Sequence, residues 1–547
     1  MNESTKAVLF SVFYISTVIL VIRSVRLAFK HWGPGAVFWN DPKSISLVLY
    51  LAIPRALIIL SMPLNGNEAG GEVILYHKLM MAIRPASLFL PAGYPFLSGS
   101  LGTILQNLVV FFPYLLLIIQ HLLGLLTALM LYETLKPRYP RVAWGLSLFW
   151  GISSFPLMFE HTTRPEFFAT FLIFLCFYLI LKYWENSRSL LLWYLGIAAG
   201  WAELTRPNFV VLLPIIAGSV YWGSKSPPLE RLKHLGRLCA GFVFIYFGFI
   251  VLVHHPNTGL WSYNWSIPAN LRVKMIDSSA LTEENDAYME LVKDNYQIGQ
   301  FLKQPVIAKY DFNQFLDYVP LYNRLPVSIK LRDKFSEFNH QYPVHEPIPL
   351  VKPDQFARLY PPEYASFGSV ETGLSLGEAF YGIVPYTRLE LSVYKKAILL
   401  NPMEYMKTVI RDLPHFLGFG SGNDKDNFLP PHCETIFSSP KFLGFYWDTR
   451  PGLDTTALGL YWSVGTNVLR GWAVINRFVF PYIYSVSFIY AMVLFLRIPP
   501  PARLAFLFFG VYLFGMIWVA PGSFRLMVPL QPIGMFLFAL PCSKWAL

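Results

Sequence analysis

Charged residues are scarce in this chain of 547 residues, in which Asp, Glu, Lys and Arg make up 14% and hydrophobic residues 54%. An ordinary soluble domain carries about 25% charged residues, so this balance excludes a single soluble domain and favours a polytopic membrane protein. Cysteine is also rare. Cys176 and Cys239 lie in or beside apolar runs, Cys542 lies near the C-terminus, and only Cys433 lies in a long polar region. This distribution gives no sign of a disulfide framework.

Long apolar runs and aromatic residues are abundant instead, and the aromatic share of 17% suits membrane interfaces. A bilayer core needs about 20 apolar residues per helix, so the runs predict about eleven transmembrane helices. They are expected at 7–28, 44–62, 106–134, 142–159, 166–184, 189–204, 207–223, 237–254, 474–496, 504–520 and 525–541. The first is interpreted as a retained helix, because no small-residue cleavage site follows it.

The sequence "LTRPN" separates the predicted helices at 189–204 and 207–223. Because proline breaks a helix and arginine belongs at a surface, we expect two spans joined by a tight turn at Arg206 and Pro207.

The orientation in the membrane follows from the distribution of Lys and Arg between alternate loops. One set of loops contains Arg23, Arg26, Lys30, Lys43, Lys136, Arg138, Arg141, Lys182, Arg188, Lys225, Arg231, Lys233, Arg237, Arg497, Arg503 and Lys544. The other set contains only Lys78, Arg84, Arg164, Arg206 and Arg525. The richer set is predicted to be cytoplasmic. The formal net charge of +11 then reflects loops that face anionic lipid, and no nucleic-acid partner is needed to explain it.

This topology divides the chain into three parts. Residues 1–254 form an N-terminal transmembrane module with a first extracytoplasmic loop at 63–104, residues 255–471 form an extracytoplasmic region, and residues 472–547 form the C-terminal transmembrane helices. The middle region is expected to be mostly helical or irregular. Within it, the stretch from Tyr386 to Phe419 has helical spacing interrupted at Asn401 and Pro402, which predicts two amphipathic helices on the membrane surface.

The outward loops carry the residues that can do chemistry. Glu68 and Glu72 lie in the first loop, Arg164 and Glu166 in the second, and the later loops contain Arg206 and Arg525. Carboxylates and arginines at one membrane face suit a reaction on a lipid phosphate. A carboxylate can take a proton from an acceptor hydroxyl, and arginine can hold a departing phosphate in a bidentate fork. Each of these residues also has a possible structural role instead of a catalytic one. In that interpretation Glu72 is a solvated loop acid, Arg206 pairs with Glu203 and Arg164 pairs with Glu166.

The stretch "GEVILYHKLM" followed by "PAGYPFLSG" resembles the first extracytoplasmic loop of the GT-C glycosyltransferases, a family of membrane enzymes that use polyprenyl-phosphate-linked donors. The segments "RPEFFATFLIFLCFYLIL", "LGIAAGWAELTRP", "AILLNPMEYM" and "GSFRLMVPLQPIGMFLFAL" resemble later parts in the same order. The likeness covers about 44–254 and 386–541. It departs from the family at Glu72, where many members have Asp, and at Leu526, where Tyr is usual.

The resemblance implies an all-α fold and a transferase that acts on the extracytoplasmic side, or the lumenal side in a eukaryotic host. It implies Glu72 as the catalytic base, with Glu68 as the alternative. The residues expected to bind substrate are Tyr76, Tyr94, Arg164, Glu166, Arg206 and Arg525. The expected partners are a polyprenyl-phosphate sugar donor, an acceptor that is a glycan, a lipid or a protein, and membrane lipid.

A cofactor is not identified by any motif. Asp424 and Asp426 lack the distal Glu of an EF-hand, and His432 and Cys433 lack a second pair for zinc, so a divalent metal stays an open alternative. The alternative functions are a membrane transporter, a flippase, and a ligase for lipid-linked glycans. A transporter is expected to contain paired broken helices in two halves, and the sequence shows no such symmetry.

Overall fold

The computed structural model describes residues 41–61, 112–161, 165–224, 226–255, 397–417, 479–520 and 524–545, together with single positions that include Lys274, Trp472 and Asn476. Within these ranges the regular structure is helical and contains no strand. The all-α prediction is therefore confirmed for the part of the chain that the structure describes. Five of its helices are long and apolar enough to cross a membrane, which suits a membrane protein.

The five long candidate spans are Pro42–Ile59, Ile118–Leu135, Pro165–Asn186, Pro228–Leu252 and Pro500–Val519. They lie in the helices α2 (Pro42–Ser61), α5 (Phe112–Leu135), α8 (Pro165–Asn186), α11 with its π-helical extension η4 (Pro228–Phe249 and Ile250–His254) and α25 (Pro500–Val519). Shorter apolar helices are α9 (Leu190–Thr205), η3 with α10 (Pro207–Leu212 and Leu213–Gly223), the helix Val479–Val493, and α26 (Gln531–Trp545), which follows the 3-10 helix η8 (Phe524–Leu530). Proline opens many of these elements because its fixed φ suits the first turn of a helix.

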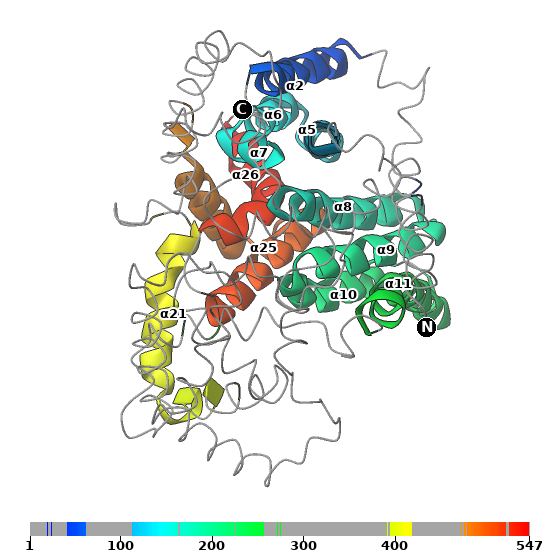
Figure 1. Cartoon of the computed structure of the whole chain (residues 1–547), viewed down its shortest axis with the longest axis vertical. Helices are drawn as coiled ribbons and strands as arrows, with labels where there is room; N and C mark the ends of the chain where they lie inside the picture. Colours follow the sequence, from blue (N-terminus) through cyan, green and yellow to red (C-terminus); the bar gives the residue numbers. More distant parts are fainter. Residues whose placement is uncertain are drawn as a thin grey trace, which may run out of the picture.

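Helix α8 lies at the centre of the bundle, with 89% of its span buried (Figure 1). Helices α9 and α11 pack closely against each other. A Cβ atom on Gly196 would lie 2.1 Å from the Leu238 carbonyl oxygen, and one on Gly241 would lie 2.3 Å from the Trp193 carbonyl oxygen. Small residues of this kind let membrane helices approach to backbone contact.

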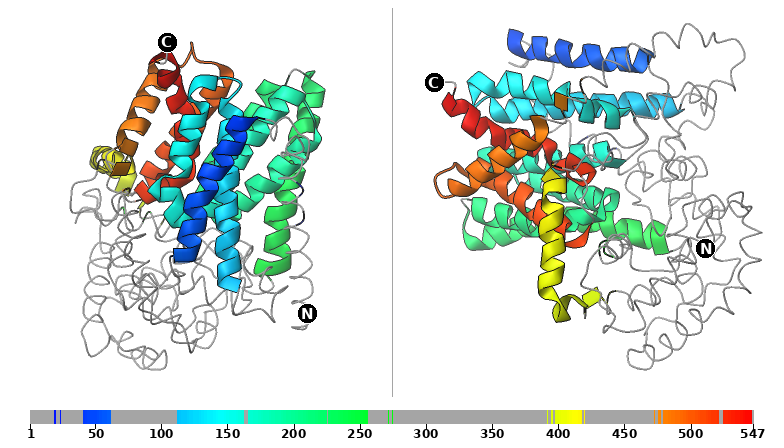
Figure 2. Two further views of the ribbon diagram at one scale, coloured as in Figure 1. Left: turned by 90° about the horizontal axis from the view of Figure 1, so that it is seen from above. Right: turned by 90° about the vertical axis from the view of Figure 1, so that its left-hand side faces the viewer.

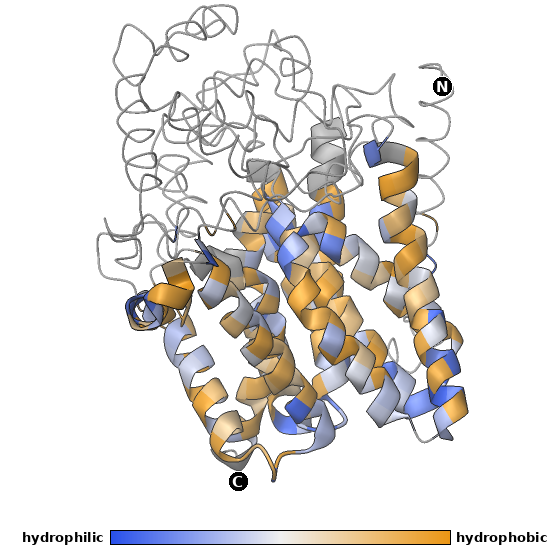
Figure 3. Cartoon of the chain, turned by 90° about the horizontal axis from the view of Figure 1, so that it is seen from below, coloured by the Kyte–Doolittle hydropathy of each residue, from blue (hydrophilic) through white to orange (hydrophobic). Residues whose placement is uncertain are grey.

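One end of the bundle collects basic residues and is called the basic end here. Lys136 pairs with Asp41, Arg138 pairs with Glu185, and Tyr183 bonds to His234. These contacts join the residue before α2 and the second turn of α11 to the turn that follows α5 and the last turn of α8. Figure 3 shows apolar residues along the middle of the bundle and hydrophilic residues gathered at this end. The opposite end, called the distal end, contains Glu160, Glu166 and Arg206.

The break predicted at Arg206 and Pro207 is confirmed. Helix α9 ends at Thr205, Arg206 has extended backbone, and Pro207 opens η3. Trp184 near the end of α8 donates to the carbonyl of Ser219 near the end of α10. The end of α9 meets the start of α8, where Arg206 pairs with Glu166. Helices α9 and α10 therefore run in opposite directions, and the chain reverses between them.

The expected single helix at 142–159 is wrong. The structure divides it into α6 (Pro140–Gly151) and α7 (Ser154–Glu160). The Ser153 hydroxyl donates to the Trp150 carbonyl at 2.7 Å, which closes the turn between them. A Cβ atom on Gly151 would lie 2.3 Å from Leu51, so α6 approaches α2 closely at its last residue. The redirected α7 places Glu160 at the distal end.

Helix α21 (Pro402–Leu417) runs across the direction of the bundle helices, as both views of Figure 2 show. Residues 397–400 are also helical and the break falls at Asn401, as the spacing predicts. Tyr405 donates to the Trp518 carbonyl, and Asp412 pairs with Lys274 at 3.2 Å. These two contacts hold α21 against the last turn of α25.

Candidate functional site

The first cluster at the distal end is a buried ion pair between two helix ends. Arg206 Nη2 lies 2.9 Å from Glu166 Oε1, and the Glu166 side chain is fully buried. Glu166 lies in the first turn of α8, where the helix dipole favours a negative charge. Arg206 follows the last residue of α9, and its extended backbone turns the chain before Pro207. The break in the helix therefore places the guanidinium beside the carboxylate.

Two further residues surround this pair. Tyr512 of α25 lies within electrostatic range of Arg206, Glu166 and Glu203. Glu203 is 3% exposed and accepts a hydrogen bond from the backbone of Val210. The alternative in which Arg206 pairs with Glu203 is wrong, because the guanidinium pairs with Glu166. Three acidic or basic side chains thus share one buried region between α8, α9 and α25.

The segment that carries Arg525 lies next to this region. Arg525 belongs to η8, which packs against α8 and against α21. Its backbone is described, whereas its side chain lies outside the described residues. The structure therefore brings the η8 segment to the helix that carries Glu166, and the role of the Arg525 side chain stays a prediction.

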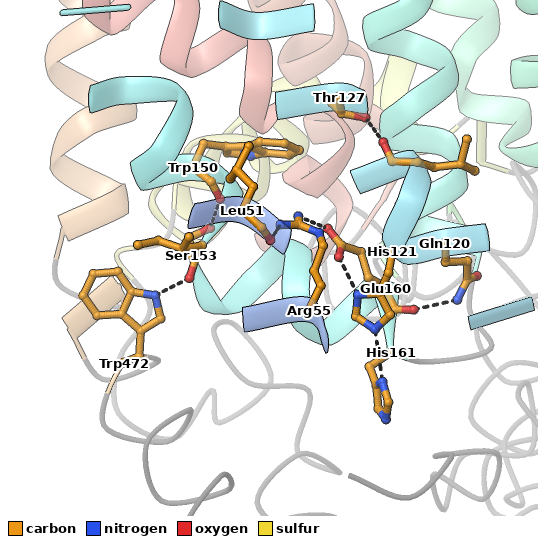
Figure 4. Close-up of polar contacts among 12 residues, drawn as sticks. Leu51, Arg55, Gln120, His121, Thr127, Trp150, Ser153, Glu160, His161 and Trp472 are labelled. Carbon is orange, nitrogen blue, oxygen red and sulfur yellow. Dashed lines mark hydrogen bonds and ion pairs between the residues drawn. The ribbon is translucent and has the colours of Figure 1, made fainter. Parts of the chain in front are cut away.

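The second cluster is a row of buried ionisable residues from α2, α5 and the end of α7 (Figure 4). Arg55 Nη2 lies 2.6 Å from Glu160 Oε1, and Nη1 donates to the Leu51 carbonyl at 2.9 Å. His121 Nδ1 lies 2.8 Å from Glu160 Oε2. Both oxygens of this carboxylate are thus engaged. Because burying a lone charge costs several kcal/mol, the pairing explains how Arg55 is tolerated inside an apolar helix.

The row continues from His121 to His161. His121 Nε2 lies 3.2 Å from His161 Nδ1. Both residues are buried, with His121 2% and His161 4% exposed. Gln120 donates from Nε2 to the backbone carbonyl of Glu160 at 2.9 Å, which ties the end of α7 to α5. Gly124 leaves room for the carboxylate, since a Cβ atom there would lie 1.9 Å from Glu160 Oε1.

The predicted site residues fall into two groups. Glu166 and Arg206 are described and lie in direct contact. Glu68, Glu72, Tyr76, Tyr94 and Arg164 lie outside the described residues, so their roles stay predictions. The site residues predicted from the sequence do not include Arg55, Glu160, His121 or His161. The available signal was a charged or imidazole side chain inside an apolar helix, which is costly unless it is paired or functional.

A third group of charges anchors the neighbouring helix α21. Lys274 Nζ lies 3.2 Å from Asp412 Oδ2 and also donates to the carbonyl oxygens of Ile517 and Ala520. Burial lowers the pKa of Lys274 from its usual range, against the opposing effect of Asp412. The ammonium group of Lys274 is engaged by two backbone carbonyls and by the Asp412 carboxylate, so it anchors α21 structurally.

The chemistry available at the distal end is acid–base and electrostatic. No group of three or more His, Cys, Asp or Glu side chains among the described residues is arranged to hold a metal ion. Paired arginines can bind an anionic group, and carboxylates and imidazoles can move protons. Comparisons of the chain with protein-family models, with curated proteins and with solved structures find no match.

Proposed function

We propose that this protein is an integral membrane glycosyltransferase. It moves a sugar from a polyprenyl-phosphate-linked donor to a glycan, lipid or protein acceptor on the extracytoplasmic side, with inversion at the anomeric carbon. The observation that carries the proposal is the buried Arg206–Glu166 pair at the distal end, beside the η8 segment that contains Arg525. The charge distribution of the loops assigns these segments to the outward side.

The reaction needs two kinds of group. The bond between the anomeric carbon and the phosphate oxygen breaks, the acceptor oxygen attacks that carbon, and the acceptor hydroxyl loses a proton. An arginine that is held by a buried carboxylate keeps its charge and its orientation, so further N–H donors of Arg206 suit the departing phosphate. Glu72 is the proposed base and Glu68 the alternative, because both belong to the first outward loop.

A polyprenyl donor also needs an apolar surface close to the charged groups. Helix α21 lies across the end of the bundle and packs against η8 and α25. Its apolar side chains Met403 and Ile410 are 69% and 62% exposed. An amphipathic helix with exposed apolar residues is suited to the membrane interface, which is where the lipid chain and the phosphate of such a donor meet.

Native mass spectrometry of the purified protein in nanodiscs tests the proposal. The protein is incubated with a panel of polyprenyl-phosphate sugars, and we expect it to retain at least one of them. Arg206→Ala is expected to weaken this retention about 10-fold or more, since a charge-assisted contact contributes about 1.5–3 kcal/mol. Arg188→Ala, which changes an exposed residue at the basic end, serves as the control. Retention of no lipid phosphosugar by the parent protein contradicts the proposal.

One observation favours a second function, a proton-coupled transporter. The Arg55–Glu160–His121–His161 row is a buried chain of ionisable groups, and such chains form proton pathways in membrane pumps and transporters. Flux of a solute into proteoliposomes that depends on a proton gradient, without sugar transfer, identifies this function. Sugar transfer to an acceptor in the absence of a gradient identifies the first.

A further inference from the structure

Glu203 is a buried carboxyl group that the proposed reaction does not use. It lies in the last turn of α9 and is 3% exposed. One of its oxygens accepts a hydrogen bond from the backbone N–H of Val210 in η3. Among the described residues, no group donates a hydrogen bond to the other oxygen, Oε2, and no lysine or arginine forms an ion pair with the carboxyl group. Within this part of the chain, Glu203 is therefore a buried acid without a neutralising cation.

The groups around Glu203 belong to three further elements. Tyr246 of α11 and Tyr512 of α25 lie within electrostatic range of the carboxyl group, and Val210 belongs to η3. A tyrosine hydroxyl can share a hydrogen bond with a carboxyl group but carries no positive charge. Burying a carboxylate without a cation costs far more than burying the neutral acid, so these surroundings favour a Glu203 that retains its proton.

Arg206 is the cation that can compete with this proton. It follows Glu203 by three residues, and Tyr512 interacts electrostatically with both of them and with Glu166. In the structure the guanidinium pairs with Glu166 at 2.9 Å. One guanidinium thus serves a region with two buried carboxyl groups. If Glu166 takes the guanidinium and Glu203 holds a proton, these three side chains together carry no net charge.

We propose that Glu203 is a proton-binding site whose occupancy is linked to the partner of Arg206. While Arg206 pairs with Glu166, the Glu203 carboxyl group binds one proton. When Glu166 no longer holds the guanidinium, Arg206 pairs with Glu203, the O–H bond of the acid breaks, and the proton leaves to solvent. The ligand is a proton, because a single unengaged oxygen supplies too few ligands for a metal ion. This linkage does not require sugar transfer, so it stands apart from the proposed function.

Infrared spectroscopy of the protein in nanodiscs tests the proton site, because the carbonyl stretch of a protonated carboxyl group is separate from the bands of ionised carboxylates. At neutral pH, subtraction of the Glu203→Gln spectrum from that of the parent protein is expected to leave one such band. Glu230→Gln changes an exposed carboxyl group on α11, and the same subtraction should leave none. Absence of the band from the Glu203→Gln difference overturns the proposal.

Variants of the ion pair test the linkage by the same subtraction. In a Glu166→Gln background the band of Glu203 is expected to disappear, because Arg206 loses its partner and pairs with Glu203. A background with both Glu166→Gln and Arg206→Gln is expected to recover the band, since no guanidinium is left to displace the proton. Glu166→Gln removes the link between α8 and α9, so its stability falls in either case. Persistence of the band in Glu166→Gln overturns the linkage, and so does its absence from both backgrounds.

Thermal unfolding at several pH values provides an independent test. In the unfolded chain a glutamate releases its proton above about pH 4.3, whereas the folded protein retains the proton of Glu203. The parent protein therefore loses stability relative to Glu203→Gln as the pH rises above that value, because glutamine has the shape of the neutral acid and does not titrate. We expect Glu203→Gln to unfold at a higher temperature than the parent at neutral pH, and at the same temperature below about pH 4. A Glu203→Gln variant that is less stable than the parent at neutral pH overturns the proposal, because the folded protein then depends on a charged carboxylate.

Discussion

Arg206 and Glu166 form an ion pair of 2.9 Å between the end of α9 and the start of α8, with the carboxylate fully buried. The pair is built from an interrupted helix and a first helical turn, so it connects two antiparallel elements at one end of the bundle. A charge pair in this position holds the helix ends together, and under the proposed function it also keeps the guanidinium oriented for the donor phosphate. Structural and functional contributions can be separated by measuring stability and donor binding on the same variants.

The stability contribution follows from burial. Glu166→Gln and Arg206→Gln are each expected to lower the free energy of unfolding by about 3–5 kcal/mol, because each leaves a buried charge without its partner. The double variant should lose less than the sum of the two, as measured by denaturant titration in detergent. Lys233→Gln provides the control, since the Lys233–Glu230 pair is exposed and a surface ion pair of this kind contributes little to stability. Additive losses would show that the two residues are not coupled.

The proposed base is tested by substitutions that retain shape. Glu72→Gln is expected to lower turnover by about 10²–10⁴ while donor binding survives, because the amide cannot accept the proton. Glu72→Asp should retain part of the activity, and Glu68→Gln should lose little. Steady-state transfer assays check these values. A dead Glu68→Gln beside an active Glu72→Gln assigns the base to Glu68, and activity in both removes the first-loop carboxylates from the mechanism.

The predicted phosphate contact of Arg525 is tested by donor affinity. Arg525→Lys is expected to weaken donor binding, because lysine does not reproduce the bidentate fork of arginine. Arg525→Ala removes the charged contact altogether and is expected to weaken donor binding by about 10-fold or more. Native mass spectrometry or calorimetry with the retained lipid phosphosugar measures the change. Equal affinity in the parent and both variants excludes Arg525 from the donor site.

The predicted topology is tested by accessibility in intact cells. Cysteines introduced at Ser98 and Ser366, in a background without the four native cysteines, should both react with a membrane-impermeant thiol reagent. The reason is the excess of Lys and Arg in the alternate loops, which retains those loops in the cytoplasm. A cysteine at Ser187, in the basic turn between α8 and α9, should react only after permeabilisation. Labelling of only one of the two outward positions contradicts the topology.

The basic end has a pH-dependent contact. Lys136 Nζ lies 2.6 Å from Asp41 Oδ2, and its hydrogen bond lowers the pKa of Asp41 to about 2 from an ordinary value of 3.8. The stabilisation is therefore complete above about pH 4 and is lost as the pH falls through about 2. Asp41→Asn should lower stability at pH 7 by less than about 1 kcal/mol, because the Lys136 side chain is 41% exposed. Thermal unfolding should show this difference at pH 7 and lose it near pH 2, and an equal difference at both pH values would contradict it.

Local sequence determined the elements whose physics is local. Apolar runs predicted an all-helical membrane protein, because unpaired backbone groups are not tolerated in lipid and a helix satisfies its own. Proline at 207 predicted where α9 and η3 separate, since it cannot continue the preceding helix. The amphipathic spacing around Asn401 likewise predicted the break that precedes α21.

Tertiary packing decided which charges meet. Arg206 has Glu203 three residues before it in the chain, yet it pairs with Glu166 of another helix, because the extended backbone at 206 turns the side chain away from α9. The close approach of Gly151 at the end of α6 to Leu51 of α2 joins residues that are distant in the sequence, and no local pattern contains it. The meeting of Arg55, Glu160 and His121 likewise requires three helices and the space beside Gly124. Each of these outcomes is governed by close packing and by the cost of burying an unpaired charge, and both depend on residues that are distant in the sequence.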